Sequence, residues 1–239
     1  SGQVAMTGDC ISGHHDLAHY YLTSRKEEVL ISQKNMEFLL KKAHPLMDIY
    51  REERKKELYA ALIENAGKEG RRRRVLAVPD LGVLPEKLLE DILERNHVVL
   101  NEKTVILECY KRSVTCLETT LKHSVVEDEV SVLSEAEYEK YPPVLSLAEC
   151  FLEKDIHLTY EEYQACIKAG RDYAKANENY QFNLTKIKGF HNIQITCFEG
   201  KWCMISKNRA PAIHFVIHHP KLRYALENMV LPIRDDEIE

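Results

Sequence analysis

The chain has 239 residues, of which 44% are hydrophobic and 30% are charged, and its formal net charge is −5. This mixture is typical of a globular protein and argues against a disordered chain. The acidic balance argues against a chain that binds nucleic acid by itself, because such domains usually carry a basic face. No apolar run approaches the roughly 20 residues that cross a bilayer, and the N-terminus lacks a signal-peptide pattern. We therefore expect a cytoplasmic protein without membrane contacts.

The cysteine pattern supports the same compartment. The cysteines are odd in number and none of them forms a Cys-x-x-Cys motif: Cys10, Cys109, Cys116, Cys150, Cys166, Cys197 and Cys203. This arrangement favours reduced thiols over a disulfide framework or a structural zinc site. Cys109 and Cys116 fall on one stripe of a predicted helix, where we interpret them as small core residues.

The first third of the sequence predicts a linker and a helical arm. Residues 1–15 are mostly small and polar, which is typical of a linker. From residue 16 to about 66, apolar residues recur at spacings of three and four, which predicts helix. Pro45 should kink this helix or divide it in two. We interpret residues 16–70 as a dimerisation arm, with a helix packed on its own domain as the alternative.

The remaining residues, 71–239, predict a mixed domain. A short apolar run at 75–78 and the helical pattern that begins at Pro85 form the start of an α/β unit. The basic run at 71–74 is interpreted as a solvated loop, with an anion site or a contact with DNA phosphates as alternatives. A capping box of Thr159 and Glu162 predicts a helix that reaches about residue 177.

The last fifty residues change to a strand pattern. "IQITCF" and "WCMIS" flank Glu199-Gly200, which predicts a hairpin, and "IHFVIHH" predicts a further strand. "PKLRYALENMV" then predicts a short amphipathic helix. The expected fold class is α+β (or α/β), with a long N-terminal helical arm followed by a mixed α/β domain. That domain should end in a β-hairpin, a strand and a short helix.

The histidines do not form a convincing metal site. His214 and His218 share one face of a predicted strand, because side chains alternate along it. No third ligand stands at a supporting spacing, so we expect neither a metal nor a cofactor. A structural role is favoured for the His218-His219 pair. The sequence also lacks the G-x-S-x-G, P-loop and G-x-G-x-x-G motifs.

The segment around the predicted hairpin also resembles a known family, which narrows the class of protein. "FHNIQITCFEGKWCMISKN" resembles the second half of a phospholipase-D-type domain, which carries H-x-K-x-x-x-x-D-G. Aligning Glu199-Gly200 with the Asp-Gly of that motif places Asn192 at the histidine and Gln194 at the lysine. His191 is one residue out of place, on the other face of the strand. The resemblance therefore implies the fold without its chemistry, as in the sugar-sensing TrmB-like regulators.

The N-terminus carries a second resemblance. "VAMTGD" resembles the "YLLTGE" that ends XRE/Cro-type helix-turn-helix domains, and the chain as a whole resembles the C-terminal portion of clostridial regulators of this type. Together the resemblances imply the effector-binding and dimerising region of a cytoplasmic transcription regulator. It would be non-catalytic and would contact DNA only through a helix-turn-helix head absent from this chain.

Candidate ligand-binding residues follow from chemistry near the predicted hairpin: Trp202, Lys207, Asn208, Arg209 and His214. Trp202 offers a stacking face, and the cations suit a small anionic effector. Two alternatives remain open. One is a phospholipase-D-like phosphodiesterase or another hydrolase, and the other is a protein-interaction domain without a ligand.

The dimerisation arm leads to a first prediction. Light scattering at micromolar concentration should give twice the 27.7 kDa mass of the chain. Paired DNA-binding heads read paired half-sites, so a regulator of this class is expected to be a two-fold dimer. A single species with the mass of the monomer would contradict it.

Overall fold

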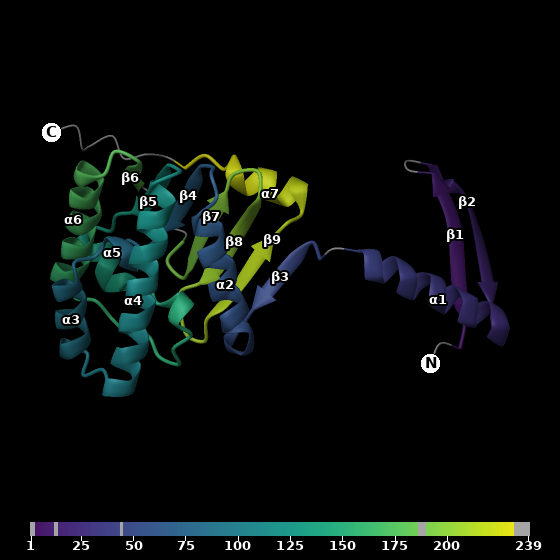
Figure 1. Ribbon diagram of the computed structural model, residues 1–239, viewed down its shortest axis with the longest axis horizontal. Coiled ribbons are helices and arrows are strands. Elements are labelled where there is room, and N and C mark those ends of the chain that lie inside the picture. Colours follow the sequence, from purple (N-terminus) through teal and green to yellow (C-terminus); the bar gives the residue numbers. More distant parts are fainter. Residues whose placement is uncertain (1–2, 12–13, 44, 186–189, 232–239) are drawn as a thin grey trace. The chain divides into compact units, whose positions relative to one another are not determined.

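The computed structural model describes residues 3–11, 14–43, 45–185 and 190–231. The chain divides into two compact units, Ser1–Pro45 and Leu46–Glu239 (Figure 1). The predicted arm at 16–70 is therefore divided between the two units. No helix in these described ranges is long and apolar enough to cross a membrane.

The first unit is a hairpin followed by a helix. Strands β1 (Ala5–Ile11) and β2 (His14–Thr23) pair in antiparallel register, and α1 (Lys26–Lys42) follows them. Glu28 in the first turn of α1 accepts hydrogen bonds from the hydroxyls of Thr23 and Tyr21, the latter at 2.9 Å. The predicted linker at 1–15 and the start of the predicted helix at 16 are wrong, because each segment supplies the other with a strand partner.

The first unit buries few side chains. Among its described residues, only Thr23 and Val29 are buried. Its large apolar side chains are mostly exposed, among them Val4, Met6, Tyr20, Tyr21, Leu22, Leu30, Ile31, Met36, Phe38, Leu39 and Leu40. A two-stranded hairpin with one helix is marginally stable when it buries so little apolar surface.

The second unit is built on a mixed sheet. Within the described ranges it has seven strands: β3 (Met47–Tyr50), β4 (Arg72–Leu76), β5 (Val126–Ser131), β6 (Tyr180–Thr185), β7 (Ile193–Phe198), β8 (Trp202–Lys207) and β9 (Ile213–Ile217). Their order is β3-β9-β8-β7-β4-β5-β6. The β4, β5 and β6 strands are parallel, and the other neighbours are antiparallel. The mixed α+β class is confirmed, as are the final hairpin, strand and helix.

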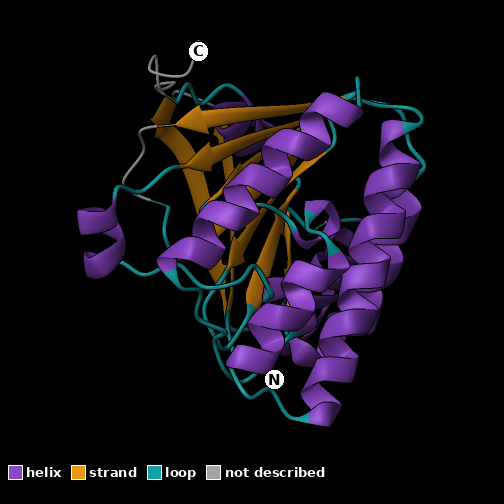
Figure 2. Ribbon diagram, turned by 90° about the vertical axis from the view of Figure 1, so that its left-hand side faces the viewer, coloured by secondary structure: helices purple, strands orange, loops and turns teal. Residues whose placement is uncertain are grey.

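The helices of this unit follow the strand connections. They are α2 (Lys55–Ala66), α3 (Glu86–Arg95), α4 (Leu100–Leu121), α5 (Glu135–Lys140), α6 (Tyr160–Ala176) and α7 (Pro220–Glu227), with short 3-10 helices η1 (Glu52–Arg54), η2 (Leu81–Val83) and η3 (Ala148–Cys150). The steps from β4 to β5 and from β5 to β6 run in the same direction. Right-handed crossovers therefore place α3, α4 and α6 on one face of the sheet (Figure 2).

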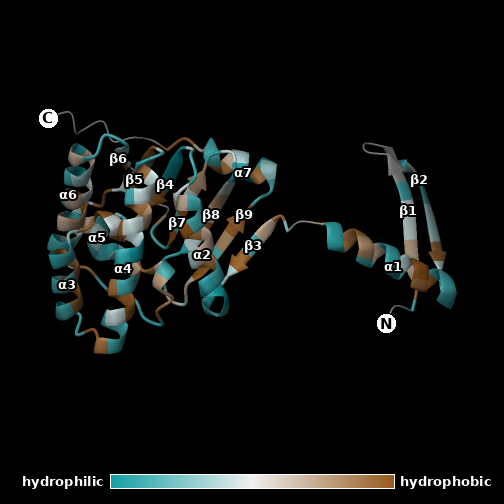
Figure 3. Ribbon diagram, viewed as in Figure 1, coloured by the Kyte–Doolittle hydropathy of each residue, from teal (hydrophilic) through white to brown (hydrophobic). Residues whose placement is uncertain are grey.

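The two faces of the sheet have separate cores. Leu76, Val126 and Val130 pack with the buried residues of α3, α4 and α6. Val75 and Ile195, which point the opposite way, pack near α7. Figure 3 shows the hydrophobic residues concentrated along strands such as β3 and β9. Alternate residues of β4 thus face the helices, and this assigns Arg72 and Arg74 to the helix-covered face.

The predicted helix from 16 to 66 is wrong between its two helical segments as well. Residues Met47–Tyr50 form β3, which pairs with β9 and sets Tyr50 opposite His214. Apolar residues recur here at spacings that fit a helix, but the free edge of β9 offers backbone hydrogen bonds to an extended segment. Tertiary pairing therefore decides the local structure.

Packing between α6 and β6 leads to a second prediction. A Cβ atom at Gly170 would overlap the Phe182 ring. Gly170→Ala should lower the free energy of unfolding by about 1–2 kcal/mol, because the overlap outweighs the roughly 1 kcal/mol gain in helix propensity. Chemical denaturation measures this. Gly67→Ala is the control, since no atom lies within 4 Å of its Cβ position. Equal stability of the two variants would show that this packing is loose.

Candidate functional site

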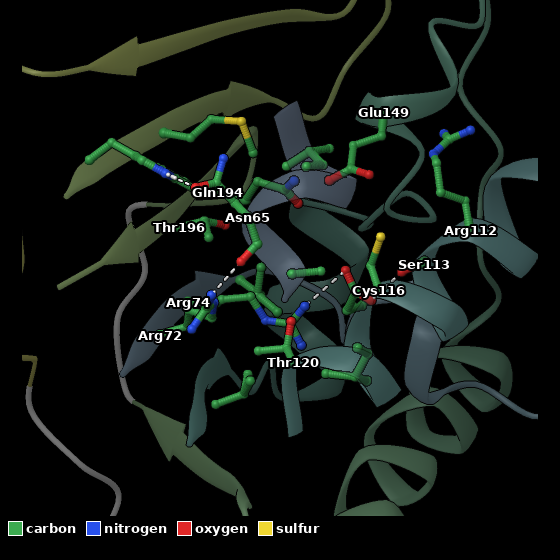
Figure 4. Close-up of a pocket in the computed structure, with 18 residues that line it drawn as sticks. Asn65, Arg72, Arg74, Arg112, Ser113, Cys116, Thr120, Glu149, Gln194 and Thr196 are labelled. Atoms are coloured by element: carbon green, nitrogen blue, oxygen red, sulfur yellow. Dashed lines mark hydrogen bonds and ion pairs between the residues drawn. The ribbon is translucent and has the colours of Figure 1, made fainter. Parts of the chain in front are cut away.

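A cavity of about 110 Å³ lies between α2, α4 and the helix-covered face of the sheet. Its polar lining comes from separate segments: Asn65 of α2; Arg72 and Arg74 of β4; Asp80, which directly precedes η2; Arg112, Ser113, Cys116 and Thr120 of α4; Glu149 of η3; and Gln194 and Thr196 of β7. Figure 4 shows these side chains converging from different elements. We call this space the Glu149 cavity.

Local structure explains how each segment reaches the cavity. Ser113, Cys116 and Thr120 are spaced by three and four residues, so they share one face of α4. Glu149 lies in η3, which ends at Phe151 in a left-handed conformation with φ of 53°. Such a conformation is uncommon for a bulky residue and is found where the surrounding structure holds it.

Arg74 connects two carboxylates at the base of the cavity. Its guanidinium lies 2.6 Å from Asp128 Oδ1 and 3.2 Å from Asp80 Oδ2. Tyr180 donates a further hydrogen bond to Asp128 at 2.5 Å. Burial raises the pKa of Asp128, whereas Arg74 beside it acts in the opposite direction. Asp80 also accepts hydrogen bonds from Ser113 Oγ at 2.7 Å and from the Gly82 backbone at 2.8 Å. The charges of Arg74, Asp80 and Asp128 are therefore paired within the protein.

The guanidinium group of Arg72 also has its hydrogen-bond partners within the protein. It donates to the carbonyl oxygens of Asn65 at 2.6 Å and Lys68 at 2.7 Å, and its guanidinium lies 3.9 Å from the centre of the Phe198 ring. Burial lowers the pKa of Arg72. Its contacts fasten the end of α2 to β4, which is a structural role.

The interpretation of residues 71–74 as a solvated loop is wrong. Arg72–Leu76 form the central strand β4, and the neighbouring strand β5 carries the acidic partners. Arg71 pairs with Glu127, and Arg73 pairs with Glu129 at 2.7 Å. Because these arginines already have acidic partners, they do not form a free basic surface for phosphates.

Glu149 differs from the other charged groups of the cavity. Among the residues that the structure describes, none donates a hydrogen bond to its carboxylate. Burial raises its pKa from 4.5 to about 7, with a further contribution from Asp80 and opposition from Arg112. Arg112 itself lies over the Tyr59 ring, 3.5 Å from its centre, and donates to Cys109 Sγ at 3.1 Å. Glu149 therefore remains open to a ligand, and so does Arg112 Nε, which is buried without a hydrogen-bond partner among the described residues.

Two of the sequence-predicted residues lie on the helix-covered face. Trp202 lines the cavity, and its Nε1 donates to Asn65 Oδ1 at 3.3 Å. His214 is buried on β9, where its ring nitrogens lie 2.7 Å from Ser206 Oγ and 3.1 Å from the carbonyl oxygen of Ala148. Burial lowers the pKa of His214 to about 4. His214 thus positions the residue before Glu149 but does not line the cavity.

The other three predicted residues form a separate turn. Lys207 donates to the carbonyl oxygen of Ala210 at 3.3 Å. The backbone of Asn208 donates to Asn192 at 2.8 Å, and Arg209 pairs with Asp155 at 3.2 Å. None of the three lines the Glu149 cavity. Their contacts stabilise the connection between β8 and β9.

The histidine pair at the end of β9 also makes structural contacts. His218 Nε2 lies 3.0 Å from Asp48 Oδ2, and His219 Nδ1 accepts a hydrogen bond from the Leu222 backbone at the start of α7. Within the described part of the chain, no three histidine, cysteine or acidic side chains are grouped as metal ligands.

Sequence reasoning missed Asp80, Arg112 and Glu149. They come from three segments that are distant in the chain, and none belongs to a recognisable motif. The helical spacing of Ser113, Cys116 and Thr120 was the available signal, but it equally fits a core stripe.

No protein-family model matches this chain, and neither the curated proteins nor the solved structures include one that is significantly similar to it.

The buried carboxyl group leads to a third prediction, on stability. A folded-state pKa of about 7 against the ordinary 4.5 means that the folded protein binds the proton more tightly. The stability that this proton contributes is present below pH 4.5 and is lost as the pH rises to about 7. Glu149→Gln avoids burying a charge, so at pH 8 it should be about 2–3 kcal/mol more stable than the unsubstituted protein.

Urea denaturation at pH 4.5 and pH 8 measures this difference, which should nearly disappear at the lower pH. Glu153→Gln is the matched control, because Glu153 is exposed on the same loop. A Glu149→Gln effect that is independent of pH would contradict the buried-carboxyl interpretation.

Proposed function

We propose that this chain is the effector-binding and self-associating region of a transcription regulator, and that it binds a small molecule in the Glu149 cavity without catalysis. The observation that carries the proposal is the Glu149 carboxylate, which lines the cavity, is desolvated enough to raise its pKa, and accepts no hydrogen bond from the described residues. Leaving such a group unpaired costs about 1–3 kcal/mol or more, and a ligand that donates to it recovers this energy.

The cavity favours a ligand with N–H or O–H donors, such as a small amine or amide. Glu149 accepts hydrogen bonds, whereas the guanidinium groups of Arg72 and Arg74 are already engaged. The apolar part of the lining, which includes Leu62, Leu117 and Met204, suits a compact apolar body. The expected anionic effector depended on Lys207 and Arg209, which are not part of this lining.

A route from the cavity to the rest of the chain runs through α2. Leu62, Asn65 and Ala66 of this helix line the cavity, and α2 follows β3 and the connection to the first unit. A ligand that contacts Asn65 in only one arrangement of α2 would shift the population towards that arrangement. This is the kind of coupling that a regulator needs.

Self-association is supported by the exposed apolar residues of the first unit. Met36, Phe38, Leu39 and Leu40 of α1 are all more than half exposed, at 57–64% of their full surface. Met36, Leu39 and Leu40 are three and four residues apart, so they share one face of α1, and an exposed apolar face of this kind is unusual on a protein that stays monomeric. The link with transcription itself depends on the two sequence resemblances.

Acid–base catalysis at the same cavity is the second candidate. A carboxyl group with a pKa of about 7 is suited to proton transfer near neutral pH. A histidine-dependent phosphodiesterase has less support. His214 is buried with both ring nitrogens engaged, and the His191 ring stacks on Tyr141 with 5.1 Å between centres.

The fourth prediction concerns binding. In a thermal-shift screen of small amines, amides and sugars, at least one compound should stabilise the protein, by about 2.7 kcal/mol at 100 times its dissociation constant. Glu149→Gln should lower the affinity for that compound by tenfold or more, because a hydrogen bond to a charged group is lost. Cys116→Leu should block binding by filling the cavity. Glu153→Gln and Thr115→Leu, at exposed positions of the same loop and helix, should bind normally.

Two outcomes would contradict the proposal. Turnover of the bound compound, or of a phosphodiester, that is lost in Glu149→Gln or His214→Ala would support an enzyme. Absence of any stabilising compound, together with stable capture of another protein, would favour the interaction-domain alternative. A helix-turn-helix encoded upstream of Gln3 would support the regulator class independently of the ligand.

A further inference from the structure

Two groups of opposite charge line the Glu149 cavity without pairing with each other. The Glu149 carboxylate accepts no hydrogen bond from the described residues. Among the same residues the Arg112 guanidinium makes one hydrogen bond, from Nη2 to Cys109 Sγ at 3.1 Å, and its buried Nε has no partner. Figure 4 draws both side chains, and no hydrogen bond or ion pair connects these two described residues. The cavity therefore offers a ligand both a negative acceptor and a positive donor.

The other charged groups of the described lining are already engaged. Arg74 lies 3.2 Å from Asp80, and Arg72 donates to backbone carbonyl oxygens at 2.6 and 2.7 Å. A ligand that bound one of these groups would have to displace an existing contact. Glu149 and Arg112 are thus the charged lining groups, among those described, with which a ligand can pair without breaking an ion pair.

We propose that the ligand of this cavity is a small α-amino acid in its zwitterionic form. Its ammonium group would donate to the Glu149 carboxylate, and its carboxylate would accept from the Arg112 guanidinium. The inference rests on the proposed function, because it names the class of ligand for the same cavity. A zwitterion pairs both charges at once, whereas a simple amine or a simple acid leaves one of them unpaired away from water, which is costly.

Gln194 supplies a further donor beside Glu149. The two residues together line a smaller adjoining space of about 10 Å³. The Gln194 side chain is buried; its Oε1 accepts a hydrogen bond from Ser146 at 2.9 Å, whereas its Nε2 donates none to the described residues. An amide nitrogen in this state can donate to one carboxylate oxygen of the amino acid while Arg112 donates to the other.

The size of the cavity limits the side chain of the amino acid. The cavity has a volume of about 110 Å³. An engineered cavity of about 150 Å³ in another protein holds one benzene molecule, which has as many non-hydrogen atoms as alanine. Leu62, Leu117 and Met204 provide an apolar wall for a short side chain. Glycine, alanine, serine and valine are therefore the appropriate probes, and phenylalanine should be too large.

The ionisation of Glu149 makes this binding depend on pH. Burial raises the pKa of Glu149 to about 7, Asp80 adds to the shift, and Arg112 opposes it. Four further titratable or charged groups face this carboxylate: Arg74 of β4, Cys109 and Cys116 of α4, and Cys150 of η3. The ionised form, which the ammonium group requires, makes up about nine tenths of Glu149 at pH 8 and about one tenth at pH 6. Affinity for the amino acid should therefore be about tenfold higher at pH 8.

Isothermal titration calorimetry on the unsubstituted chain at pH 8 tests the proposal. At least one of glycine, L-alanine, L-serine and L-valine should bind, and L-phenylalanine should not. The amino acid that binds is then compared with two analogues that each lack one charge. For L-alanine these are ethylamine, which lacks the carboxylate, and propionate, which lacks the ammonium group. Each analogue should bind at least about tenfold more weakly, because hydrogen bonds to a charged group are lost.

Two variants assign each charge of the ligand to its residue. Arg112→Gln should lower the affinity for the amino acid about tenfold or more without lowering that for ethylamine. Glu149→Gln should have the same effect on the amino acid without lowering the affinity for propionate. Lys111→Gln and Glu153→Gln, at exposed positions of the same helix and loop, are the matched controls and should bind normally. Circular dichroism checks the fold, and if a variant is unfolded, the analogue comparison on the unsubstituted chain decides the question.

The outcomes separate this inference from the proposed function. An analogue that binds as tightly as its amino acid would overturn the inference and leave a ligand-binding cavity in place. The same holds if all the amino acids fail while another compound from the thermal-shift screen binds. Equal losses of affinity for the amino acid and for ethylamine in Arg112→Gln would show that Arg112 has only a structural role, and would also overturn it. Failure of every compound would count against the proposed function itself.

Discussion

Charge pairing between the central parallel strands is the constraint on which the second unit depends. Asp128 is buried and the Arg74 side chain is only 13% exposed, so neither charge would be tolerated without the other. Arg73 and Glu129 form the equivalent pair on the opposite face. A slip of one residue would turn every one of these side chains to the wrong face, so the pairing also fixes the register of the sheet. The base of the Glu149 cavity and the core under α7 are both set by this register.

The short segment at 148–150 contacts both β9 and α4 and supplies Glu149 to the cavity. His214 Nε2 lies 3.1 Å from the carbonyl oxygen of Ala148, the Glu149 side chain faces the cavity, and the Glu149 carbonyl oxygen lies 3.8 Å from Cys109 Sγ. A single turn of the loop, held on both sides, therefore presents the Glu149 carboxylate to the cavity. The buried, uncharged state of His214 suits this supporting role, because both of its nitrogens are engaged.

Local signals were reliable where neighbouring residues determine the structure. The capping box of Thr159 and Glu162 begins α6, and the alternating residues around Glu199-Gly200 form the hairpin of β7 and β8. The region 16–66 was misread because its apolar spacing fits a helix, whereas β2 and β3 depend on partners elsewhere in the chain. Of the five predicted site residues, only Trp202 lines the cavity, since the cavity is assembled from segments that are distant in sequence.

The sequence by itself determined the mixed α+β class, the helix starts with strong caps and the final hairpin, strand and helix, because these depend on local backbone preferences and side-chain alternation. Only the tertiary structure decided the division at Pro45, the pairing of Arg71, Arg73 and Arg74 with the acidic residues of β5, and the meeting of Asp80, Arg112 and Glu149. Burial and electrostatic pairing act between residues that the chain brings together only on folding. No local pattern could therefore reveal that the Glu149 carboxylate would accept no hydrogen bond from the residues that the structure describes.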